Sequence, residues 1–169
     1  MTIQDLGSIG ELVAALATVA TLVYLAIQIR QNTRTVRTST YQAVLESSNR
    51  FNELVLDNPE LHRIYHVGRS DPTQLADEER ARFRLLIGQL LNVYETMFLQ
   101  YERGTLDEDF WLARRRGLRA VLSQPGIRSH VKERLLVRNQ QGQGARVASF
   151  NELVIAMLNE PPAQREPAA

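Results

Sequence analysis

Residues 12–29 read LVAALATVATLVYLAIQI, and this stretch decides how the chain is organised. Fifteen of its eighteen residues are apolar, and the exceptions are Thr18, Thr21 and Gln28. Threonine is tolerated in lipid because its hydroxyl can bond a carbonyl of its own helix. As a helix the stretch is about 27 Å long, close to the roughly 30 Å hydrocarbon core of a bilayer. We therefore predict a transmembrane helix over residues 1–30, and its span includes Leu12, Leu16, Val19, Val23 and Ile27.

Two other interpretations of this stretch stay open. A cleaved signal peptide needs a basic segment before the apolar run, whereas residues 1–11 carry Asp5 and Glu11 and no Lys or Arg. A core helix buried in a soluble oligomer is the stronger alternative, because alanine-rich segments are only moderately hydrophobic. The membrane interpretation fits the length and the flanking residues best.

The charges beside the stretch predict its orientation. Arg30, Arg34 and Arg37 follow it, and no cation precedes it. Positive residues beside a span favour the cytoplasmic side of the membrane. We therefore expect a single-pass protein of the cell (inner) membrane, with the N-terminus outside and the rest of the chain in the cytoplasm.

Residues 31–138 predict a small helical bundle. An apolar stripe at helical spacing begins at Tyr41 and ends near Leu56, and Asn58 followed by Pro59 is typical of a helix start. Gly68 then suits a helix C-cap. The strongest periodicity follows the acidic turn at residues 77–79, and its apolar positions are Phe83, Leu86, Ile87, Leu90, Leu91, Tyr94, Phe98 and Tyr101.

Two further helices are predicted before residue 138. One begins at Asp107, contains Trp111 and ends before Pro125, and the next contains Ile127, Val131 and Leu135. No stretch alternates apolar and polar residues over enough positions to predict a strand. The fold class expected is all-α, with an N-terminal transmembrane helix that continues into a small cytoplasmic helical bundle.

The C-terminal part is predicted to be a linker and a short helix. Residues 139–148 have the composition of a flexible linker. In residues 149–169, Ser149 and Glu152 form a capping box that opens a short amphipathic helix, and a disordered, proline-containing tail follows it. The helix either folds back onto the bundle or docks on another subunit or protein. The residues that would make this contact are Phe150, Leu153, Val154, Met157 and Leu158.

Composition excludes several classes of function. The net charge of +1 predicts no attraction to nucleic acid, and the absence of cysteine removes disulfides and thiolate metal sites. No motif for nucleotide binding or nucleophilic catalysis occurs in the chain. We expect no cofactor and no catalysis of its own.

The best metal candidates are His62 and His66. Their spacing of four residues places both imidazoles on one helix face, but residues 63–65 lack the Glu of the zinc-protease motif. A metal role therefore ranks low. A related hypothesis is a ligand-binding bundle in which both histidines, Tyr65 and Glu95 line a pocket.

Several landmarks give the chain a resemblance. It is similar to a family of uncharacterised bacterial membrane-associated helical proteins, over roughly residues 1–130. The resemblance implies bacterial origin and membrane association and no activity. The landmarks are, in order, DLG (5–7), LVYLAIQIRQNTR (22–34), STYQA (39–43), DNPEL (57–61), DEERARF (77–83) and YERGTLDEDFW (101–111).

The leading functional hypothesis is a membrane-anchored interaction or scaffold module. Its expected partners are membrane lipid and either a second copy of the chain or an unidentified protein. The alternatives are a ligand- or metal-binding bundle and a soluble oligomer that buries the N-terminal helix.

Overall fold

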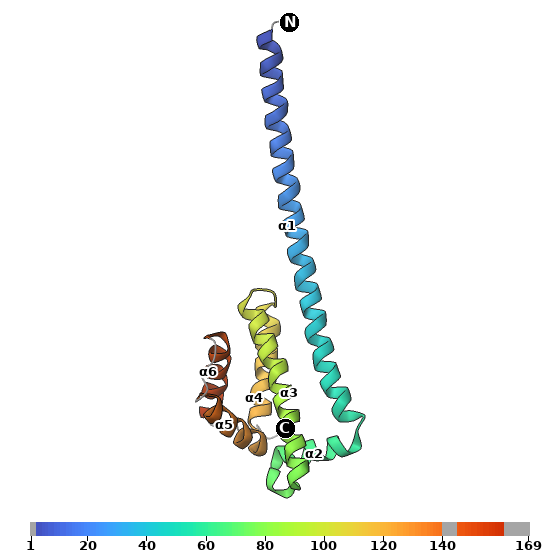
Figure 1. Ribbon diagram of the computed structural model, residues 1–169, viewed down its shortest axis with the longest axis vertical. Coiled ribbons are helices and arrows are strands. Elements are labelled where there is room, and N and C mark those ends of the chain that lie inside the picture. Colours follow the sequence, from blue (N-terminus) through green and yellow to red (C-terminus); the bar gives the residue numbers. More distant parts are fainter. Residues whose placement is uncertain (1–2, 140–144, 161–169) are drawn as a thin grey trace, which may run out of the picture. The chain divides into compact units, whose positions relative to one another are not determined.

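The computed structural model describes residues 3–139 and 145–160, and these residues form helices without any strand. The helices are α1 (Ile3–Leu56), α2 (Pro59–Ser70), α3 (Asp77–Glu102), α4 (Glu108–Leu122), α5 (Pro125–Asn139) and α6 (Ala145–Asn159), with a short 3-10 helix at Pro72–Gln74 (Figure 1). The prediction of an all-helical protein is confirmed. The chain divides into two units, Met1–Ser39 and Thr40–Ala169, so the boundary lies within α1.

Helix α1 is continuous over 54 residues, as the lack of Pro up to position 58 and of Gly after position 10 allows. Its last turns carry the predicted stripe. Val44, Phe51 and Val55 are buried, and their spacing of seven and four residues places them on one helix face. The helix ends at Leu56, where it was predicted to end.

The core of the second unit is built around α3, which lies beside α4 and α6 (Figure 1). The predicted α3 stripe is confirmed with two qualifications: Tyr94 and Tyr101 are only half-buried, and Met97 is buried although the pattern omitted it. Trp111 from α4 packs against Phe98 and stacks on Tyr101, with ring centroids 5.5 and 6.0 Å away. Such contacts fix aromatic rings in one arrangement. The buried residues of α3 are Phe83, Leu86, Ile87, Leu90, Leu91, Met97 and Phe98.

Gly68 does not end α2, so that prediction was wrong. The helix continues to Ser70 and is closed by Asp71, whose N–H bonds the Val67 carbonyl at 2.9 Å. Gly68 is instead a close-approach position: a Cβ built on it would lie 2.4 Å from Phe83 Cδ2. The glycine is needed for helix packing, and a C-cap glycine and a packing glycine look alike in sequence.

The C-terminal helix begins earlier than predicted. Helix α5 runs to Asn139 and α6 begins at Ala145, so residues 145–148 of the expected linker are helical, and residues 140–144 lie outside the described residues. Ser149 and Glu152 are therefore interior positions of α6, and the predicted capping box was wrong. Ala145 and Arg146 are strong helix formers, which the composition of the segment concealed. The predicted tail at 161–169 also lies outside the described residues.

Helix α6 packs on its own bundle. Four of the five residues offered for docking, Phe150, Val154, Met157 and Leu158, are buried in the core, and Leu153 packs partly buried against it. Phe150 contacts Phe98, with ring centroids 5.7 Å apart. Of the two alternatives for this helix, the structure has the fold-back, so these side chains are not a free docking surface.

Candidate functional site

The most distinctive candidate is the apolar segment of α1. In the described part of the chain, it belongs to the one helix that is long and apolar enough to cross a membrane. Of the predicted span positions, Leu16, Val19, Val23 and Ile27 are between 51 and 63% exposed. The side chain of Leu12 lies outside the described residues. The segment is therefore apolar and exposed on every side of the helix among the described residues.

The polar side chains of this segment are satisfied inside the helix itself. Thr18 Oγ1 donates to the Ala14 carbonyl at 2.9 Å, and Thr21 Oγ1 donates to the Ala17 carbonyl at 2.8 Å. Gln28 Nε2 donates to the Tyr24 hydroxyl at 2.7 Å, near the polar end of the segment. A helix in hydrocarbon must satisfy its own polar groups because no water reaches them. The segment meets that requirement at these three side chains.

A cationic stretch follows. Arg30, Arg34 and Arg37 are exposed and form no ion pair with any residue that the structure describes. The sequence contains no Asp or Glu between Glu11 and Glu46 to neutralise them. Their spacing of four and three residues places the three guanidiniums along one side of α1.

The histidine pair is formed, but it is incomplete as a metal site. The rings of His62 and His66 lie 4.4 Å apart on the exposed face of α2. Slight desolvation, the Arg69 guanidinium and the His62 imidazole all lower the pKa of His66. Within residues 3–139 and 145–160, no third Asp, Glu, His or Cys joins them to make a metal-binding group. Two ligands are fewer than the three or four of ordinary zinc sites.

The residues of the predicted ligand pocket do not line the two grooves described next. Tyr65 packs against the core, where its ring and that of Phe51 have centroids 6.3 Å apart. Burial raises the pKa of its hydroxyl. Glu95 is half-buried on α3. Neither residue, and neither histidine, lines the grooves described next.

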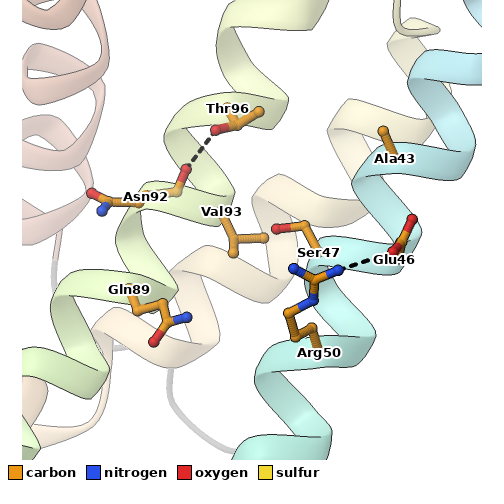
Figure 2. A pocket seen from close by; sticks show the side chains of 8 residues that line it. All are labelled: Ala43, Glu46, Ser47, Arg50, Gln89, Asn92, Val93 and Thr96. Atoms are coloured by element: carbon orange, nitrogen blue, oxygen red, sulfur yellow. Dashed lines mark hydrogen bonds and ion pairs between the residues drawn. The ribbon is translucent and has the colours of Figure 1, made fainter.

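A groove of about 360 Å³ lies between the end of α1 and α3 (Figure 2). Its only charged side chains are Glu46 and Arg50, which pair with each other at 3.0 Å. Thr96 Oγ1 is also engaged, donating to the Asn92 carbonyl at 2.9 Å. The two charges of the groove are therefore paired with each other at the surface. Its lining residues are Ala43, Glu46, Ser47, Arg50, Gln89, Asn92, Val93 and Thr96.

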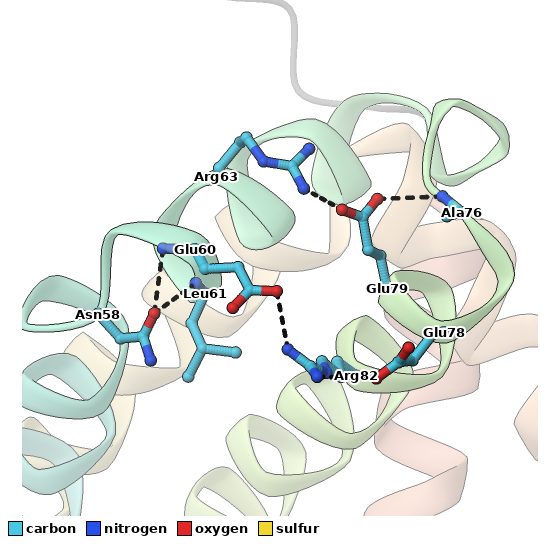
Figure 3. Close-up of polar contacts among 8 residues, drawn as sticks. All are labelled: Asn58, Glu60, Leu61, Arg63, Ala76, Glu78, Glu79 and Arg82. Carbon is cyan, nitrogen blue, oxygen red and sulfur yellow. Dashed lines mark hydrogen bonds and ion pairs between the residues drawn. The ribbon is translucent and has the colours of Figure 1, made fainter.

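The densest polar network links α2 to the start of α3 (Figure 3). Arg63 pairs with Glu79, whose other oxygen accepts the Ala76 N–H at 3.0 Å, so the pKa of Glu79 is lowered. Arg82 bridges Glu60 and Glu78, at 2.8 Å each. Asn58 caps α2 as predicted, accepting the N–H groups of Glu60 and Leu61 at 3.0 and 3.1 Å. These contacts order two helix starts, and their function is structural.

A second groove, between α3 and α5, escaped the sequence analysis. It has a volume of about 910 Å³ and brings Arg84, His130 and Arg134 together. The two helices are separated by more than twenty residues, so no spacing rule connects their side chains. The only signal in sequence was a cation beside an apolar stripe, which is ordinary for a solvent-exposed helix edge.

Comparison of the chain with protein-family models, with curated proteins and with solved structures found no match. The resemblance to uncharacterised bacterial membrane-associated proteins therefore stays a prediction.

Proposed function

We propose that the chain is a membrane-anchored helical interaction module, in which residues 12–29 span the inner membrane and the bundle lies in the cytoplasm without catalysis of its own. The observation that carries the proposal is the exposure of the apolar segment on all sides, with Leu16 at 63% and Val23 at 54%. A core helix of a soluble protein is mostly buried, whereas this segment is covered by none of the described residues. Exposed apolar surface of this extent marks contact with a membrane or a partner.

The flanking charges favour a membrane over a soluble partner. Arg30, Arg34 and Arg37 follow the apolar run at once, where cations anchor a span on the cytoplasmic side. The bonds of Thr18 and Thr21 within their own helix are compatible with lipid, although Thr33, Thr35 and Thr38 of the polar stretch make the same bonds.

The role as an interaction module rests on what the bundle offers. Some of its charged side chains are paired, in the contacts of Glu46 with Arg50, Arg63 with Glu79 and Arg119 with Glu160. None of these arrangements places a nucleophile beside a base. A bundle tethered to a membrane by one helix concentrates its surface there for a partner.

Fractionation tests the membrane anchor. The full chain is expected to stay in membranes through carbonate and high-salt washes. The double variant Val19→Arg/Val23→Arg is expected to be released, because each central arginine costs about 2.5–3.5 kcal/mol of insertion free energy. Val36→Arg places one arginine beyond the span and is the control. Release of the unaltered chain by the washes contradicts the proposal and supports a soluble oligomer.

Cysteine labelling tests the orientation, since the chain has no cysteine of its own. With a membrane-impermeant maleimide, Ser8→Cys is expected to react in intact spheroplasts and Ser70→Cys only after lysis. Reaction of Ser70→Cys in intact spheroplasts overturns the predicted topology while leaving the anchor itself in place.

A further inference from the structure

The groove between α3 and α5 gathers positive charge with no acid in its lining. Helix α3 supplies the Arg84 guanidinium and helix α5 supplies the His130 imidazole and the Arg134 guanidinium. Arg84 makes no ion pair with another described residue. Elsewhere in the bundle Arg50, Arg63, Arg82 and Arg119 each pair with a carboxylate, whereas Arg69, Arg103 and Arg116, like Arg84, form no ion pair with a described residue. The groove is lined by Ala81, Arg84, Leu85, Gly88, Gln89, Asn92, His130 and Arg134.

The backbone of α3 makes room for one of these cations. Gly88 lies in the wall of the groove, and a Cβ built on it would be only 3.1 Å from a terminal nitrogen of Arg134. The guanidinium therefore lies over a stretch of helix that has no side chain. A larger residue at position 88 would displace it.

His130 brings a buried polar atom to the groove. Its Nδ1 atom is buried and has no hydrogen-bond partner among the described residues. Burial and then Arg84 lower the pKa of His130, Glu133 raises it, and Arg134 lowers it least. Glu133 lines a smaller adjoining cavity of about 90 Å³ that Arg84 and His130 also border, together with Arg80. Arg80 is engaged there by the carbonyls of Pro72 and Leu75 at 3.2 and 3.0 Å.

We propose that this groove binds a phosphate group, held by the Arg84 and Arg134 guanidiniums with His130 beside it. Two guanidiniums suit a phosphate because each donates a fork of N–H groups to its oxygens. A phosphate monoester carries about −1.5 to −2 charges at neutral pH, which two guanidiniums can match. Gln89 and Asn92 add amide donors along the same wall.

The rest of the ligand has space in the groove. Its volume falls in the range of about 300–1,000 Å³ that small-molecule sites occupy. Leu85 is 74% exposed in the wall and offers an apolar contact to whatever carries the phosphate. The phosphate group belongs either to a soluble phosphoester or to a lipid headgroup. The inference goes beyond the proposed function, because it does not depend on the anchor.

Two titrations distinguish a soluble phosphoester from a lipid headgroup. The full chain in a neutral detergent is titrated with inorganic phosphate and with glycerol phosphate, and the full chain in bilayer discs of neutral lipid is compared with discs that contain phosphatidic acid. The imidazole resonances of the three histidines are followed by NMR. In the arm that contains the ligand, the pKa of His130 is expected to rise with saturation, while those of His62 and His66 stay constant. The detergent arm needs no bilayer, so its result is independent of the membrane proposal.

Variants decide whether the groove is responsible. Arg84→Gln is expected to weaken binding about tenfold or more, as loss of a charge-assisted hydrogen bond does. Arg116→Gln removes an exposed arginine outside this groove and is expected to change affinity less than about twofold. Gly88→Ala keeps every charge but presses on Arg134, and it is expected to weaken binding while the helix stays folded.

Saturation by soluble phosphate assigns a phosphoester, and saturation only in phosphatidic acid discs assigns a lipid headgroup. The proposal is overturned if neither arm saturates, or if Arg116→Gln weakens binding as much as Arg84→Gln. Near-ultraviolet circular dichroism of each variant checks that the bundle is intact.

Discussion

Two stretches of α1, residues 14–29 and 44–55, hold their apolar side chains in opposite ways. In the first, Leu16 and Leu22 are 63 and 61% exposed, while in the second Val44 and Phe51 are 4 and 6% exposed. Both stretches are continuous helix of the same element. The difference lies in their patterns, since the first is apolar on every side and the second repeats apolar residues on one face.

The comparison teaches what each pattern demands. A one-sided stripe can be buried by a neighbouring helix, and Phe51 and Val55 form such a cluster with Leu86 and Leu90. A helix that is apolar all round would need several neighbours at once, or lipid. The predictions below break or sharpen this contrast, from the largest expected effect to the smallest.

The sharpest test makes the same substitution in the core of the bundle and in the apolar segment. Leu118→Ala removes a fully buried side chain of α4 and is expected to lower the free energy of unfolding by about 2–5 kcal/mol. Leu22→Ala removes an exposed side chain and is expected to change it by less than about 0.5 kcal/mol. Urea unfolding of the full chain in neutral detergent, followed by the fluorescence of the single tryptophan, Trp111, measures both. A comparable loss in Leu22→Ala would mean that the apolar segment belongs to the same core.

A smaller effect tests the close packing of the bundle. Gly68→Ala introduces a Cβ against the Phe83 ring and is expected to destabilise the bundle by about 1–3 kcal/mol, although alanine favours a helix by about 1 kcal/mol. Gly88→Ala is the control, because its nearest neighbour is the flexible end of Arg134, which can move. The same urea assay separates the two. Stabilisation by both variants would show that helix propensity outweighs packing at Gly68.

Much of the fold could be predicted because its signals are local. Asn58 before Pro59, the acidic turn at residues 77–79 and the α3 stripe each act within one or two turns of helix. Gly68 was misinterpreted because its role depends on a distant contact, since Phe83 lies fifteen residues away in sequence. Ser149 was misinterpreted because residues 145–148, directly before it, are already helical.

The candidate sites divide in the same way. The apolar segment is one run of sequence, so it was found at once. The groove between α3 and α5 joins Arg84 to His130 and Arg134, which only the packing of these two helices brings together. The histidine pair followed a local spacing rule, and the rule placed the two rings correctly without supplying further ligands.

The smallest expected effect concerns charge, which also differs between the apolar segment and the bundle. The pKa of Glu79 is lowered by the Ala76 N–H and by Arg63, so its carboxylate stabilises the fold above the unfolded pKa of about 4.3, and this contribution is lost as pH falls through the folded pKa. Glu79→Gln is therefore expected to be less stable than the wild type at pH 7, and the difference is expected to close on acidification. Glu53→Gln, which removes an exposed carboxylate of α1, is the control.

Urea unfolding at stepped pH measures this difference, and added salt is expected to shrink it because the pair is at the surface. Residues 12–45 contain no carboxylate, so retention of the chain in membranes is expected to stay constant over the same pH range. A stability difference that widens as the pH falls would show that Glu79 is not held as a carboxylate in the folded bundle. Loss of membrane retention on acidification would instead show that ionised carboxylates of the bundle are needed to keep the chain in the membrane. The apolar segment would then not act as an anchor independently of the bundle.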